Sequence, residues 1–197
     1  QGAVDGGAVA GRWSLAAPAA VSLAADGAAL AQTCLLTAEG RQGRVCAQAA
    51  WSPPDGTRLA LEWAGLQVAQ WLPDVTAEVS GQGQITLTPD GSLNGGLETT
   101  LGPGFARFDS SQGVRQLAHG GGRLMASIGA SGAAASLTLR PLAAGEISAS
   151  LRLPELSKVT MADNPRIEGR LSANLPDLSG LQAWLTDLDK VQGQLDG

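Results

Sequence analysis

The nine residues from Ile167 to Leu175, which read IEGRLSANL, decide the fold class. Every second position is apolar or glycine, and the positions between them carry Glu, Arg, Ser and Asn. Side chains alternate between the two faces of a β-strand, so this pattern predicts a strand with one apolar and one polar face. The same alternation returns at 147–153 and 135–139, around 85–87, and more weakly at 59–63.

Glycine and proline separate these segments at short intervals. Pro89-Asp90-Gly91 predicts a turn before Leu93, and the glycines at 120–122 predict another. Short connections join antiparallel neighbours, because a parallel crossover needs a dozen or more residues. The sequence therefore predicts an all-β fold, an elongated antiparallel meander of about ten to twelve strands. Residues 1–197 are expected to form a single fragment of a longer repetitive β-domain.

Two segments depart from the alternation. The leucines at three- and four-residue spacing between 178 and 188 predict an amphipathic helix, and 66–72 predicts a shorter helical turn that Pro73 ends. In both segments a Trp-Leu pair precedes a Val-x-Gly-Gln strand opening, which makes a weak internal repeat around 66–83 and 181–195. Such repetition is typical of an elongated array whose units bury their apolar faces against neighbours.

Composition excludes several classes of protein. The 197 residues carry a net charge of −5 without any Lys/Arg cluster, so we expect no nucleic-acid partner. No apolar run reaches 18 residues, and we therefore expect no membrane-spanning helix. Hydrophobic residues make up 44% of the chain, but with only two Phe and no Tyr they supply few bulky side chains for a compact core.

Cys34 and Cys46 are the only cysteines. If Gly40 centres a turn, the two cysteines lie directly opposite each other on antiparallel strands, at a separation that suits a disulfide. A metal site or a reactive thiol is the functional alternative. Two buried free thiols without a function are the structural alternative. We favour the disulfide, which implies an oxidising compartment.

The sequence around the candidate catalytic residues does not contain the motifs that an active site would need. His119-Gly120-Gly121-Gly122 matches the oxyanion loop of lipases, but the chain has no G-x-S-x-G serine, and a glycine-rich turn explains the run. Carboxylates such as Glu155 are scattered singly. We expect no enzyme activity and no catalytic, cofactor or metal site. The five tryptophans are interpreted as core anchors rather than ligand contacts, and they are Trp13, Trp51, Trp63, Trp71 and Trp184.

The order of motifs along nearly the whole chain resembles a known family. The motifs are Gly11-Arg12-Trp13 leading into Val21-Ser22-Leu23, Thr33-Cys34-Leu35, Arg44-Val45-Cys46 with Trp51, the stretch 61–72 with Val79-Ser80-Gly81, and Leu175-Pro176-Asp177 with Trp184 and Val191-Gln192-Gly193. This series resembles the periplasmic repeat region of TamB, the inner-membrane component of the translocation and assembly module and a relative of AsmA-like proteins.

The resemblance implies a long β-sheet curled into an open, taco-like groove with an apolar interior. It also implies a periplasmic segment of an inner-membrane-anchored protein of a Gram-negative bacterium, with a role in outer-membrane protein assembly or phospholipid transport. The expected partners are phospholipid acyl chains or a hydrophobic protein client, with the outer-membrane barrel TamA as a partner of the full-length protein. The groove is expected to include Ile85, Leu87, Leu137, Leu139, Ile147, Leu151, Leu153, Ile167, Leu171 and Leu175. Strict alternation on both strands also predicts that the apolar residues of 147–153 share a dry interior with those of 167–175.

Two other functions remain open at this point. A secreted β-solenoid or sandwich that binds or hydrolyses carbohydrate would need paired carboxylates beside exposed tryptophan. A structural spacer would fill its interior with its own side chains. The alternation alone does not separate an open groove from a packed core, because both need one apolar face.

Overall fold

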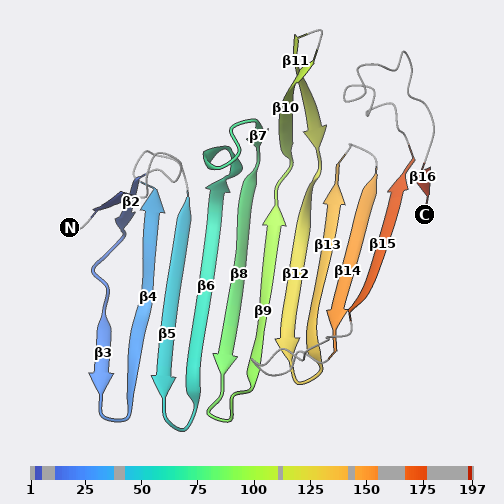
Figure 1. Cartoon of the computed structure of the whole chain (residues 1–197). Coiled ribbons are helices and arrows are strands. Elements are labelled where there is room, and N and C mark those ends of the chain that lie inside the picture. The colour runs from blue at the N-terminus through green and yellow to red at the C-terminus, as the bar shows by residue number, and fades with distance from the viewer. Residues whose placement is uncertain are drawn as a thin grey trace.

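The computed structural model describes residues 3–5, 12–37, 43–110, 113–141, 145–154, 167–176 and 195–196. Within these ranges the chain is almost entirely extended (Figure 1). The strands are β1 (Ala3–Asp5), β2 (Arg12–Leu15), β3 (Val21–Ala24), β4 (Gly27–Thr37), β5 (Arg44–Ser52), β6 (Gly56–Gln67), β7 (Val75–Thr76), β8 (Glu78–Leu87), β9 (Leu93–Leu101), β10 (Gly104–Ser110), β11 (Gly113–His119), β12 (Gly121–Gly129), β13 (Gly132–Arg140), β14 (Glu146–Leu153), β15 (Glu168–Leu175) and β16 (Leu195–Asp196).

Thirteen strands form one open sheet in the order β1-β2-β4-β5-β6-β8-β9-β12-β13-β14-β15-β16, with β3 also paired to β4. Every pairing is antiparallel, and most neighbours in space are neighbours in sequence. The all-β fold and the antiparallel meander predicted from the sequence are confirmed. The sheet does not close, and the described strands outnumber the ten to twelve expected because several short edge strands carry little alternation.

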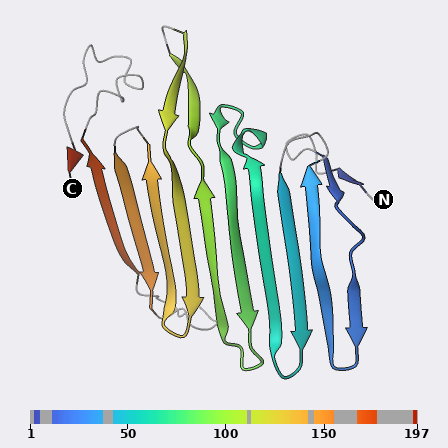
Figure 2. The same ribbon diagram turned by 180° about the vertical axis from the view of Figure 1, so that it is seen from behind.

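A small second sheet of β11, β10 and β7 interrupts the meander. The β10–β11 hairpin extends beyond the end of the main sheet, and β9 and β12 remain neighbours beneath it (Figures 1 and 2). β7 joins this hairpin through Thr76, whose hydroxyl donates to the Phe105 carbonyl and accepts from the Phe105 N–H. The sequence does not predict this sheet, since residues 104–119 show no sustained apolar alternation.

Turn chemistry explains where the chain reverses. Between β8 and β9, Gly91 adopts φ +83°, a left-handed conformation that glycine tolerates best. The Asp90 carboxylate accepts hydrogen bonds from Thr88 Oγ1, from the Ser92 N–H and from Ser92 Oγ. The turn predicted at Pro89-Asp90-Gly91 is confirmed. At the other predicted turn, Gly120 separates β11 from β12, and the Gly121 N–H donates to His119 Nδ1.

Helical structure is smaller than expected. The segment 66–72 forms only one 3₁₀ turn at Val68–Gln70, because β6 continues to Gln67 and β7 begins at Val75. The helix expected between 178 and 188, the second repeat copy at 181–195 and Trp184 fall largely outside the described residues.

The main sheet is a single layer, and no described element covers either face (Figures 1 and 2). Only four described apolar residues are buried, namely Cys46, Val68, Ala77 and Leu175. The strands are therefore held by their hydrogen-bonded ladders and by cross-strand neighbours on each face rather than by a packed interior. This corrects the interpretation of the tryptophans as core anchors for Trp51 and Trp71, which are about half exposed at 48% and 45%.

Candidate apolar binding face

The strand register sorts the side chains of the main sheet onto two faces. Residues directly opposite each other in antiparallel strands point to the same face. Leu59 lies opposite Ile85 and Ala49, Ile85 lies opposite Gly95, and Gly95 lies opposite Ile128. Following such pairs from β3 to β15 defines the apolar face, on which the only polar side chains are threonines at 33, 37, 57 and 99.

Residues on the apolar face line up in rungs that run across the strands. One rung from β6 to β14 consists of Leu59, Ile85, Gly95, Ile128, Ala133 and Leu153. The next consists of Leu61, Gly83, Leu97, Ala126, Ala135 and Leu151. Five steps between strands make each rung about 24 Å long. The face therefore offers continuous apolar tracks perpendicular to the strands.

A shallow hollow of about 390 Å³ lies where these two rungs run side by side. Its floor consists of glycine and alanine, at Gly83, Gly95, Ala126, Ala133 and Ala135. Longer side chains rise around that floor, at Leu59, Leu61, Ile85, Leu97, Ile128 and Leu153. Short apolar side chains flanked by longer ones thus form the hollow.

The groove residues predicted from the sequence share this face. Ile147 lies opposite Ala173 and Leu139, and Leu171 lies opposite Ala149. Leu137 and Ile85 lie on this face in rungs that are separated by the rung of Ala135. Leu87, Leu151, Leu153 and Leu175 take the same face by register, and Ile167 directly precedes β15.

One part of that prediction is wrong for the described residues: the face is not dry. Leu171 is 72% exposed and Ile167 is 62% exposed, whereas Leu175 is 6% exposed. The reason is architectural, because a single layer has no second sheet or helix to cover its apolar side. Sequence reasoning also missed Leu97, Leu124 and Ile128, whose face follows only from the pairing of strands.

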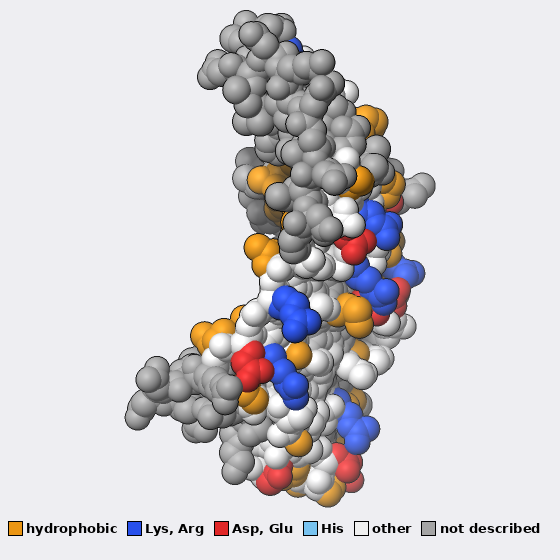
Figure 3. Space-filling view, turned by 90° about the vertical axis from the view of Figure 1, so that its right-hand side faces the viewer, with side chains coloured by type: hydrophobic (Ala, Val, Ile, Leu, Met, Phe, Trp, Pro, Cys, Tyr) orange, Lys and Arg blue, Asp and Glu red, His pale blue; other side chains and the backbone are white. Residues whose placement is uncertain are grey.

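The opposite surface, here called the polar face, carries the charged side chains of the strands. Ion pairs link Arg44 to Glu62 at 2.5 Å, and Arg123 to Glu98 at 2.7 Å. Figure 3, which views the sheet from the β15 side, shows charged side chains in the middle and on the right of the described surface. The apolar face therefore adjoins no ionised group of its own strands, and its local environment favours apolar ligands.

The disulfide prediction is confirmed. Cys34 and Cys46 lie directly opposite each other on β4 and β5 and are joined by a disulfide on the polar face. The bridge ties two strands at one end of the sheet. The centre of the expected turn, at Gly40, lies outside the described residues.

Trp51 and Trp63 do not stand beside carboxylates on the sheet. Trp51 and Trp63 stand on the apolar face, opposite Thr57 and Gly81, whereas Glu62 and Glu98 stand on the polar face. A glycosidase needs two carboxylates on either side of a bound sugar. The described strands do not bring such a pair beside these indole rings.

The described residues contain no group of three or more His, Cys, Asp or Glu side chains arranged to hold a metal ion. The described residues also include no helix that is long and apolar enough to cross a membrane. The fold and the face define a class of protein, an open single-layer antiparallel sheet with one apolar and one charged surface.

Comparison of the chain with protein-family models, with curated proteins and with solved structures found no match in any of the three.

Proposed function

We propose that the apolar face is a hydrophobic conduit or holding surface for phospholipid acyl chains or for a hydrophobic protein client. The observation that carries the proposal is a face that is both uncharged and exposed across the sheet, from Leu23 on β3 to Leu171 on β15. Exposed apolar patches larger than a few hundred Å² are rare on monomers and mark interaction sites.

The chemistry of a sheet face suits acyl chains. The backbone N–H and C=O groups of the inner strands are already paired in the ladders, so a ligand on this face does not need to form hydrogen bonds with them. Acyl chains supply none and gain free energy by leaving water. The rungs of Leu, Ile, Ala and Gly give such chains a path across many strands without crossing a charge.

The cellular setting we propose is the periplasm of a Gram-negative bacterium, as a TamB-like scaffold that supports outer-membrane protein assembly or phospholipid transport. Two features support this setting: the motif order described above, and a Cys34–Cys46 disulfide, which persists in oxidising compartments. TamA enters the proposal as a partner of the full-length protein. No catalytic role is proposed.

Photo-crosslinking from two adjacent residues on opposite faces tests the proposal. A photoreactive amino acid at Ile85, in the apolar hollow, should capture lipid or client in cells, whereas the same probe at Gln84 on the polar face should not. Mass spectrometry of organic extracts then identifies co-purifying phospholipid. Equal labelling from both positions, together with a lipid-free extract, would remove the basis for the conduit.

A further inference from the structure

A second hollow lies on the polar face, over β12, β13, β14 and β15, and measures about 500 Å³. Two neighbouring rungs form it. One runs from Met125 through Ser136 and Ser150 to Arg170, and the other from Ser127 through Ala134 and Arg152 to Glu168. Short Ser and Ala side chains make the floor, and the longer side chains of Met125, Arg152, Glu168 and Arg170 stand around it.

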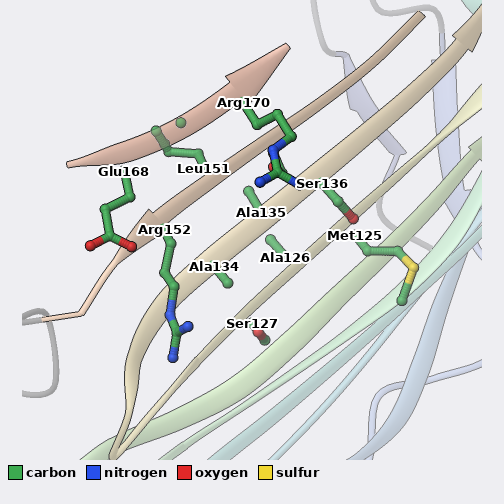
Figure 4. Close-up of a pocket in the computed structure, with 12 residues that line it drawn as sticks. Met125, Ala126, Ser127, Ala134, Ala135, Ser136, Leu151, Arg152, Glu168 and Arg170 are labelled. Atoms are coloured by element: carbon green, nitrogen blue, oxygen red, sulfur yellow. The ribbon is translucent and has the colours of Figure 1, made fainter. Parts of the chain in front are cut away.

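Two arginines stand at one end of this hollow. Arg170 lies opposite Ser150 and Arg152 lies opposite Glu168, so the two arginines are diagonal neighbours in the register of adjacent strands. Figure 4 shows both side chains extending from the sheet on the side of Ser127 and Ser136. The hollow thus places two cations beside one carboxylate, in a chain whose net charge is −5.

The arginines of the hollow differ from three others on the polar face. Arg44, Arg123 and Arg140 each pair with a glutamate. Neither Arg152 nor Arg170 forms an ion pair or a side-chain hydrogen bond with another described residue. Their N–H donors are therefore available to a ligand that enters the hollow.

We propose that this hollow binds a phosphate group, held by Arg152 and Arg170 with help from the hydroxyls of Ser136 and Ser150. A guanidinium presents a planar fork of donors that matches phosphate oxygens in pairs. Two forks and two hydroxyls offer more donors than the two oxygens of a carboxylate accept. A phosphate, with more oxygens and up to two negative charges, matches both cations.

The site is independent of the conduit function, because its side chains lie on the face opposite to the apolar rungs. Changing Arg152 or Arg170 leaves Leu151 and Leu171 on the apolar face unaltered. Loss of phosphate binding and loss of acyl-chain binding are therefore separable outcomes of different variants.

Titration of the whole chain with inorganic phosphate, followed by arginine Nε–Hε NMR signals, tests the proposal. Wild type should saturate with shifts at both arginines, and R152Q/R170Q should bind at least about tenfold more weakly, given the strength of charged hydrogen bonds. The matched control is R58Q, which removes one exposed arginine from β6 on the same face. A thermal melt of each variant checks that the fold is retained.

Vesicle flotation identifies the source of the phosphate. Flotation with phosphatidylglycerol vesicles that disappears in R152Q/R170Q assigns the site to a lipid headgroup. Binding of inorganic phosphate without flotation assigns it to a soluble phosphate compound. Equal phosphate affinity of wild type and R152Q/R170Q, or an equal loss in R58Q, would overturn the proposal.

Discussion

The indole of Trp63 lies against Gly81, its direct partner on the neighbouring strand β8. A Cβ atom built on Gly81 would approach Trp63 Cζ2 to 2.6 Å and the Glu98 carbonyl oxygen to 2.3 Å. The glycine therefore makes room for a large aromatic ring on the apolar face, and the ring covers a backbone that would otherwise be bare. Pairing of this kind between glycine and an aromatic residue stabilises sheets and helps to set register.

Gly81→Ala is expected to destabilise the protein by about 1–3 kcal/mol, because the new methyl group meets backbone as well as the ring. Chemical denaturation measures the change. Gly96→Ala on β9 is the control, since a Cβ there would meet nothing closer than 3.6 Å. That control should be neutral or slightly stabilising, because alanine loses less backbone entropy than glycine. Equal destabilisation of both variants would contradict the role assigned to Trp63.

Reduction of the Cys34–Cys46 disulfide is expected to cost about 3 kcal/mol, from the chain entropy that the bridge removes from the unfolded state. Urea denaturation with and without reductant measures the loss. A C34A/C46A variant should match the reduced protein and should not respond to reductant. Two reactive thiols, found by titrating the unreduced protein in denaturant, would show that the bridge is absent.

The Asp90 carboxyl is expected to titrate near pH 2. Hydrogen bonds from the Thr88 hydroxyl, then from the Ser92 N–H and hydroxyl, stabilise the carboxylate and lower the pKa from 3.8 to about 2. Because the folded-state pKa is the lower one, the stabilisation is complete above pH 3.8 and is lost as pH falls toward 2. Wild type should therefore melt above D90N at neutral pH, and the difference should vanish near pH 2. A carboxyl midpoint by NMR close to 3.8 would contradict the network.

Part of this architecture follows from sequence because alternation is a local property. The strands around Leu151 and Leu171, the turn at Gly91 and the opposition of Cys34 and Cys46 all depend on residues close in the chain. Period-two patterning fixes which residues of one strand share a face. It therefore predicted the strands and the common face of the expected groove residues.

Local sequence patterns predict neither how exposed a side chain is nor which residues of different strands come together. An apolar face has the same alternation whether a second layer covers it or leaves it open, so the expectation of a dry interior failed at Leu171. The hollow at Arg152 and Arg170 depends on strand pairing, which brings Ser127 and Ser136 of earlier strands beside them. In the sequence, the residues of this hollow appear only as polar positions between apolar ones. Any solvent-exposed face of a strand has that pattern, so it does not identify a site.

Leu171→Asp is expected to leave the fold nearly intact while abolishing crosslinks to lipid or client at the apolar face. Leu171 is 72% exposed on β15, so water still hydrates a carboxylate there, and the change in unfolding free energy should stay within about 0.5 kcal/mol. The ligand, however, would meet a charge in its path, which apolar chains do not compensate. Thermal melting and crosslinking from Ile85 in the same variant measure the two effects separately.

Leu175→Asp is the matched control for that variant, on the same strand and the same face. Leu175 is 6% exposed, so its replacement removes buried apolar contacts and places a carboxylate where water is scarce. Because a shorter, charged side chain is then buried, the free energy of unfolding should fall by about 2–5 kcal/mol. If the face were instead the packed core of a spacer, Leu171→Asp would unfold the protein as Leu175→Asp does. A folded Leu171→Asp protein that keeps its crosslinks and its full function would exclude the apolar face as the ligand path.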